Sequence, residues 1–196
     1  MAGEDSIMLE VPSAETVVLG VGNTILSDDG VGVHAAQMLR DDPRLPAGIA
    51  ILDGGTLGLE LLGYISDASR VLFLDAVNAG AVPGTVTRLT GGDLLATKSG
   101  CSVHQLGVAD LIAALTLVSN KIEDIVVLGV QPANTDWGTS LSPAVEAALA
   151  PLVDRALTQL ELWRGKRRRA RRNAGWESRV LRRRSPDPWT SSGILD

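Results

Sequence analysis

Short apolar segments alternate with helical segments along most of the chain, and this alternation constrains the fold more strongly than any other feature. Runs typical of buried strands occupy residues 17–19, 49–52, 71–74 and 125–130. Segments with helical periodicity or helix-start signals lie at about residues 28–40, 57–65, 104–117 and 142–163. This pattern predicts an α/β fold of three layers, in which helices cover both faces of a twisted, mostly parallel sheet.

Turn and capping signals refine this prediction at two places. Residues 84–89 alternate in polarity after the turn Val82-Pro83-Gly84, which predicts a strand at the sheet edge that can run antiparallel. A glycine-rich loop is expected to follow it. At the last helix we expect Ser142 to be the cap and Pro143 to lie in the first turn, where a missing N–H costs nothing.

Composition favours one domain and does not call for an oxidising compartment. A chain of 196 residues that is 45% hydrophobic can bury one core. Cys101 is the single cysteine, so a disulfide framework is impossible. Residues 1–9 carry Glu4 and Asp5 where a signal peptide would be basic, and no apolar run reaches the roughly 18 residues of a membrane span. We therefore expect a soluble, cytoplasmic protein without a membrane partner.

The net charge of −5 conceals a sharp asymmetry along the chain. Residues 164–196 hold eleven of the eighteen Lys and Arg, which leaves residues 1–163 with seven basic and twenty acidic side chains, a balance of −13. So acidic a body argues against a nucleic-acid partner. A run of like charges followed by prolines is typical of a solvated segment. We expect an N-terminal extension over residues 1–15, one domain over 16–163 and a disordered basic tail over 164–196.

Three residues with metal-binding side chains follow apolar strands or open a helix. Asp29 follows the first strand, Asp75 ends the third, and His104 begins the helix after the glycine-rich loop. In a parallel α/β sheet such positions lie along the carboxyl edge, where residues distant in sequence can converge on one crevice. Two carboxylates and an imidazole could hold a metal ion, with an open position for catalysis. A carboxylate at the end of an apolar strand also needs a partner such as a cation.

Alternative interpretations of the same segments are weaker. Gly20-Val21-Gly22 resembles the start of a dinucleotide-binding motif, but Ile25 stands where the third glycine belongs, and two acids occupy the helix entrance. For Asp28 we expect a helix-capping role, whose removal costs about 0.5–2 kcal/mol. Asp53 either caps a turn or lines the same crevice. A Cys101 nucleophile with His104 as base lacks a third orienting group.

The chain resembles the hydrogenase maturation proteases, the nickel-dependent endopeptidases that act on [NiFe]-hydrogenase large subunits. The resemblance extends from about residue 16 to about residue 160. Its most specific parts are the block from Gly20-Val21-Gly22-Asn23 to Asp28-Asp29-Gly30 and the motif His104-Gln105-Leu106-Gly107. Asp53-Gly54-Gly55-Thr56 and Leu74-Asp75-Ala76 add to it. The N-terminal extension and the basic tail fall outside the family pattern.

The resemblance implies a five-stranded sheet and a metal-contacting, catalytic site formed by Asp29, Asp75 and His104. It implies a single cleavage near the C-terminus of the large-subunit precursor, once nickel has been inserted. The nickel is thus presented by the substrate, and its preference for carboxylate and imidazole ligands suits these three residues. A metallochaperone without cleavage and a small-molecule-binding α/β domain remain the alternative functions.

Overall fold

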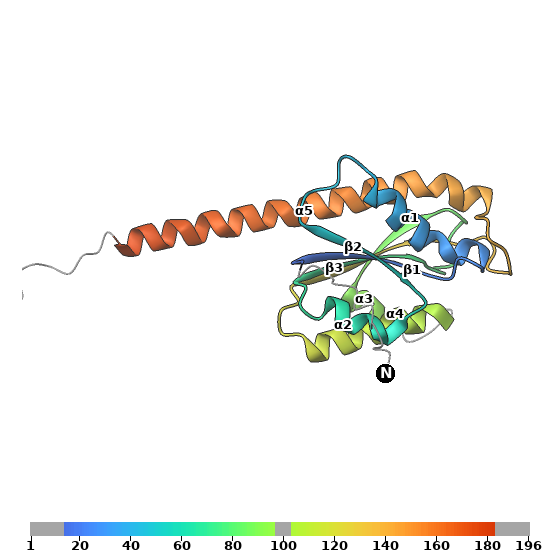
Figure 1. Ribbon diagram of the computed structural model, residues 1–196, viewed down its shortest axis with the longest axis horizontal. Coiled ribbons are helices and arrows are strands. Elements are labelled where there is room, and N and C mark those ends of the chain that lie inside the picture. Colours follow the sequence, from blue (N-terminus) through green and yellow to red (C-terminus); the bar gives the residue numbers. More distant parts are fainter. Residues whose placement is uncertain (1–13, 97–102, 183–196) are drawn as a thin grey trace, which may run out of the picture. The chain divides into compact units, whose positions relative to one another are not determined.

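A five-stranded sheet forms the centre of the computed structural model, which describes residues 14–96 and 103–182 (Figure 1). The strands are β1 (Thr16–Val21), β2 (Ile49–Gly55), β3 (Arg70–Ala76), β4 (Val86–Thr90) and β5 (Asp124–Val130). Their order in the sheet is β2-β1-β3-β5-β4. The pairs β1 with β2, β1 with β3 and β3 with β5 are parallel, whereas the edge strand β4 runs antiparallel to β5. The predicted sheet, including its antiparallel edge, is confirmed.

The helical elements connect these strands. They are η1 (Ser27–Gly30), α1 (Val31–Arg40), η2 (Gly58–Leu61), α2 (Leu62–Ile65), α3 (Gly91–Ala96), α4 (Val103–Val118) and α5 (Pro143–Arg182). Helix α1 lies on one face of the sheet, and α2, α3 and α4 lie on the other (Figure 1). The three-layer α/β arrangement is therefore as predicted.

Both faces of the central strands are buried, as their nearly continuous apolar sequence requires. Alternate residues of β1, β3 and β5 belong to a core shared with η2, α2 and α4, which includes Leu19, Phe73, Ile65, Ile112 and Leu115. The intervening residues Val18, Leu72 and Val126 are also fully buried, on the opposite side of each strand. Such a sheet is held rigidly from both sides, so residues at its strand ends have fixed positions.

The chain changes direction around β1, and this creates a crevice. From β1 it passes through α1 to β2 on one side, and it returns through η2 and α2 to β3 on the other side of β1. The order of strands therefore reverses at β1, which makes the carboxyl ends of β1 and β3 the topological switch point of the sheet. Such a switch point is where open α/β sheets place their ligands. Gly20 pairs with Leu74 across this boundary, directly before Asp75.

One predicted helix and one predicted loop differ from the structure. The helix expected over residues 57–65 is a 3₁₀ turn, η2, followed by the single turn α2, and Gly58 there adopts a positive φ of 54°. The glycine-rich loop contains the short helix α3. Thr90 and Asp93 cap it reciprocally: Thr90 N–H donates to Asp93 Oδ2 at 2.8 Å, and Asp93 N–H donates to Thr90 Oγ1 at 3.3 Å. This capping box explains a helix that begins with two glycines.

The last helix ends later than predicted. We expected it to end near Trp163 and irregular chain to follow, but α5 continues to Arg182. Its added part, residues 164–182, is rich in Arg, a strong helix former, and the next proline is Pro186. The contacts divide the chain into two units, residues 1–158 and 159–196, of which the second contains this continuation. No helix of the described residues, α5 included, is long and apolar enough to cross a membrane.

Candidate active site

The loop after β1 positions Asp29 at the switch point. Gly22 has φ 124°, and a Cβ atom added there would lie 1.9 Å from the Asp29 carbonyl oxygen, so only glycine fits. The next residue, Asn23, donates its backbone N–H to Asp29 Oδ2 at 2.7 Å. Asp29 is 4% exposed. The Gly20-Val21-Gly22 motif thus serves the close packing of the Asp29 turn against the end of β1.

Asp75 is the penultimate residue of β3 and is 2% exposed. Its Oδ1 accepts a hydrogen bond of 2.8 Å from the N–H of Ala76. Burial raises the pKa of the Asp75 carboxyl to about 7, the Ala76 N–H opposes this shift, and the negative charge of Asp29 adds to it. Asp75 can therefore exchange a proton near neutral pH, a property typical of groups at functional sites.

The structure brings the two predicted acids together and gives the backbone position of the third residue. Element η1, which contains Asp29, contacts β3, and the charge of Asp29 acts directly on Asp75. His104 is the second residue of α4, whose side chains at that end lie outside the described residues, as does Cys101. Among the side chains that are described, no three His, Cys, Asp or Glu cluster closely enough to hold a metal ion. The predicted triad, which includes His104, remains a prediction.

Asp28 does not cap a helix, and its predicted role is wrong. The residue is 0% exposed, and its carboxylate accepts bonds from Ala133 N–H at 2.8 Å and Asn134 N–H at 3.0 Å. Ser142 donates both its N–H, at 2.6 Å to Oδ1, and its hydroxyl, at 2.9 Å to Oδ2. Burial alone would raise the pKa of Asp28, but these hydrogen bonds outweigh it and lower the pKa. Asp28 therefore ties the β1–η1 loop to the β5–α5 loop, residues 131–142.

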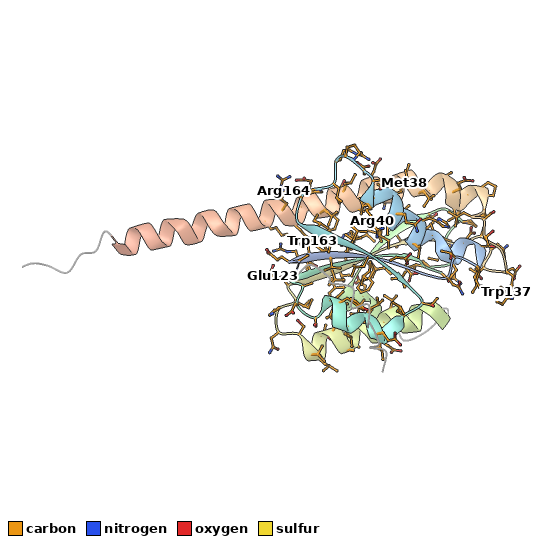
Figure 2. All side chains as sticks on the ribbon, viewed as in Figure 1. Met38, Arg40, Glu123, Trp137, Trp163 and Arg164 are labelled. Carbon is orange, nitrogen blue, oxygen red and sulfur yellow. The ribbon has the colours of Figure 1, made fainter. Side chains whose placement is uncertain are left out.

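Backbone hydrogen bonds reinforce this junction between the two loops. Ser27 N–H donates to the Gly138 carbonyl at 2.8 Å, and Gly138 N–H donates to the Ile25 carbonyl at 3.0 Å. The Ser27 hydroxyl donates to the Asp136 carbonyl at 3.0 Å. Ser27 itself has a positive φ of 46°, a costly conformation for a residue other than glycine. Trp137 lies at the outer end of this loop pair (Figure 2).

Gln131, which the sequence did not single out, organises the loop after β3. The side chain is buried, and its carbonyl oxygen accepts bonds from Ala79 N–H at 2.8 Å and Ala81 N–H at 3.1 Å. Its amide group donates to Asn78 Oδ1 at 3.2 Å. A glutamine directly after a buried strand was the available signal, because its position at the carboxyl edge matches that of Asp75. The connections after β1, β3 and β5 are thus held by buried polar side chains.

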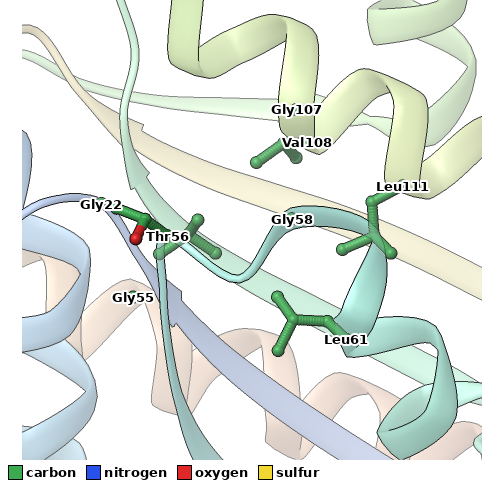
Figure 3. Close-up of a pocket in the computed structure, with 9 residues that line it drawn as sticks. Gly22, Gly55, Thr56, Gly58, Leu61, Gly107, Val108 and Leu111 are labelled. Atoms are coloured by element: carbon green, nitrogen blue, oxygen red, sulfur yellow. The ribbon is translucent and has the colours of Figure 1, made fainter.

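A small pocket opens at the carboxyl ends of β1 and β2, against the first turns of α4 (Figure 3). Its volume is about 110 Å³. The lining is apolar side chains and backbone, from Val21, Gly22, Gly55, Thr56, Gly58, Leu61, Gly107, Val108 and Leu111. Asp53 caps the adjoining turn, where its Oδ1 accepts the Gly55 N–H at 3.1 Å. The pocket therefore joins the Asp29 loop to the α4 segment one turn after His104.

Comparisons with known proteins agree with this arrangement. Residues 33–159 match the family model described as hydrogenase maturation protease. The chain is 36% identical to the Escherichia coli protein named hydrogenase 2 maturation protease, over 74% of this chain and 89% of that protein. It is also 36% identical to the hydrogenase expression/formation protein HupD of Bradyrhizobium diazoefficiens, over 75% of this chain and 78% of HupD.

Solved structures share the fold as well as the sequence. The hydrogenase maturating endopeptidase HybD from E. coli superposes with a TM-score of 0.69 at 34% identity, covering 75% of this chain and 92% of HybD. The [NiFe] hydrogenase maturation protease HybD from Thermococcus kodakarensis gives a TM-score of 0.62 at 26% identity, covering 74% of this chain and 98% of that structure. The chain therefore belongs to the hydrogenase maturation protease family.

Proposed function

We propose that this endopeptidase removes a C-terminal peptide from the nickel-loaded large-subunit precursor of a [NiFe]-hydrogenase. Family membership supports the class of reaction, which is hydrolysis of a peptide bond during hydrogenase maturation. The single observation that carries the site assignment is the pair of buried carboxylates, Asp29 and Asp75, at the β1–β3 switch point.

The carboxylate pair is suited to a divalent cation supplied from outside. Burial is the main reason why the pKa of Asp75 rises to about 7, and repulsion by the negative charge of Asp29 raises it further. A divalent cation between them would offset that repulsion and favour both ionised forms. In our proposal the cation is the nickel of the precursor, so the protease recognises nickel insertion directly.

His104 supplies the third contact to nickel in this proposal. Helix α4 runs back toward the start of β5, so its first turn lies at the carboxyl edge, where β1 and β3 end. Gly107, three residues later in the same helix, lines the pocket beside Gly22. Imidazole and carboxylate are ligands that bind nickel well.

The same groups can activate the water that attacks the scissile bond. In one route the precursor's nickel polarises the scissile carbonyl, and the aspartates only hold the metal. In the other, ionised Asp75 removes a proton from water as general base, for which a pKa near 7 is well matched. Because Asp75 must ionise in the free protease, kcat/KM should rise through pH 7 with a single proton. We place the reaction in the cytoplasm, as the sequence predicts.

Cleavage of purified precursor tests the proposal. The nickel-loaded large subunit is incubated with the protease, and its intact mass is followed; we expect loss of one C-terminal peptide. Asp29→Ala, Asp75→Ala and His104→Ala should each remain folded by circular dichroism and abolish this mass loss. The control is Asp41→Ala, an exposed acid at the end of α1, which should cleave normally. Normal cleavage by all three site variants would refute the site assignment.

A further inference from the structure

Of the nine large apolar side chains that are exposed in the described residues, five follow strands at the edge of the sheet that carries the acids, and the other four lie in α1, α4 and α5. Within the described residues, exposed examples occur in the connections leaving β1, β2, β3 and β5, namely Ile25, Leu57, Leu59, Val82 and Trp137. Trp137 is the largest of them and is 81% exposed. Figure 2 shows it at the opposite end of the sheet from Glu123, which precedes β5. Exposed apolar groups that lie together beside a functional site indicate an interaction surface.

Trp137 and Ile25 form one unit of this surface. Ile25 is 48% exposed, and its carbonyl oxygen accepts the N–H of Gly138, the residue after Trp137, at 3.0 Å. Leu26 and Gly138 form an isolated parallel bridge, which places the two loop segments side by side. We call Ile25 and Trp137 the apolar rim. Ile25 precedes Asp29 by only four residues, so the rim adjoins the site of cleavage.

The rim is held rigidly, although its side chains are exposed. Asp28 accepts four hydrogen bonds from the loop that carries Trp137, and Ser27 adds two more, to the carbonyls of Asp136 and Gly138. The buried carboxylate of Asp28 therefore fixes this loop, while the side chain of Trp137 stays exposed. A loop whose backbone is already ordered loses little conformational entropy when it binds a partner, and tryptophan is enriched among residues that dominate interface energetics.

We propose that the apolar rim is the anchor by which the protease holds the folded body of its protein substrate. The inference rests on the proposed function. A precursor whose C-terminal segment reaches Asp29 must lay its folded surface over the adjoining loops, and the rim is the apolar part of the loops nearest to Asp29. The expected counterpart is an apolar depression on the precursor beside its metal site. The rim contributes to binding, and the acids contribute to cleavage.

Steady-state kinetics with the nickel-loaded precursor test this assignment. We expect Trp137→Ala to raise KM by about tenfold or more while kcat stays within about twofold, because truncation of an interface anchor weakens binding. Trp137→Phe should recover much of the loss. The matched control is Leu117→Ala: Leu117 is 85% exposed but lies near the end of α4, close to Ser119, which donates to Ser66 ahead of β3 at the other edge. Leu117→Ala should match wild type in both KM and kcat.

Direct binding separates failure of the anchor from failure of the proposed function. Association of the precursor with wild type and with Trp137→Ala is measured by interferometry, with thermal melting to verify that both are folded. An unchanged KM and an unchanged dissociation constant for Trp137→Ala would overturn the anchor while leaving the protease assignment intact. If wild type binds the precursor without cleaving it, the proposed function fails, and a weaker complex with Trp137→Ala would still support the anchor.

Discussion

Asp75 is held in a position where its ionised form is disfavoured, and this has a measurable effect on stability. Its pKa rises from an ordinary value of 3.8 to about 7 in the folded chain, first because of burial and further because of Asp29. Between these two values the folded state keeps a proton that the unfolded state has lost. The unfolding free energy therefore falls as pH rises from about 4 to about 7, by about 4 kcal/mol from this residue alone.

Asp75→Asn tests that effect, because asparagine has nearly the same shape and does not ionise. The variant should lose activity yet gain stability relative to wild type as pH increases, with the gain levelling off above pH 7. Urea unfolding at pH 4, 5.5, 7 and 8 measures the difference. A difference that does not change with pH would mean that Asp75 titrates normally in the folded protein.

Asp28 illustrates the opposite case, in which hydrogen bonds outweigh burial and keep the group ionised. Asp28→Ala would leave three backbone N–H groups and the Ser142 hydroxyl without their acceptor. We expect the unfolding free energy to fall by about 3 kcal/mol or more, which exceeds the cost of a lost helix cap. Substrate binding should also weaken, because the loop that carries Trp137 loses its hydrogen bonds to Asp28. Chemical denaturation measures the change in unfolding free energy. The exposed control Asp41→Ala should change stability by about 0.5 kcal/mol at most.

At the scale of elements, the contact of α1 with the sheet fixes the switch point. A Cβ atom at Gly32 would lie 2.1 Å from the Leu74 carbonyl oxygen and 2.4 Å from that of Val21. Helix α1 therefore touches the backbones of β1 and β3 directly before Asp75. Glycine is required here for close approach rather than for an unusual backbone angle.

Gly32→Ala should consequently destabilise the protein by about 2–3 kcal/mol, because backbone atoms cannot move aside as side chains do. Cleavage should also fall, since α1 and η1 shift away from β3. The matched control is Gly63→Ala in α2, where an added Cβ meets nothing within 4 Å and a gain of about 0.5 kcal/mol is expected. Thermal melting of both variants gives the comparison, and equal stability of the two would contradict the proposed packing.

Elements whose signals are local were predictable, and those that depend on distant contacts were not. Strand β3 is apolar from Val71 to Leu74 and Asp75 follows directly, so both the strand and the site candidate follow from the sequence. The role of Asp28 depends on partners 105 to 114 residues away, and a local capping rule cannot detect them. Likewise, a lone tryptophan such as Trp137 carries no sequence signal for exposure. Adjacency of β1 and β3, which unites Asp29 with Asp75, is also a property of the topology.

On the scale of the whole molecule, the fold places the acids, a pocket and the apolar rim on one edge of the sheet. Buried acids occupy the switch point, a pocket of about 110 Å³ opens beside Gly22 of the Asp29 loop, and the apolar rim adjoins the same loop. The opposite edge carries the ends of α1 and α4. A folded protein can therefore approach the acids from one direction and bring its metal and its scissile segment to them together.

Nickel dependence of cleavage tests the central claim most directly. Protease freed of metal by chelator is mixed with nickel-free precursor and, separately, with nickel-loaded precursor, and C-terminal mass loss is followed. We predict cleavage of the loaded precursor alone, because the acids and His104 act on a metal that the substrate presents. Equal cleavage of both precursors, or activity that requires zinc added back to the protease, would contradict the account and indicate an ordinary metallopeptidase.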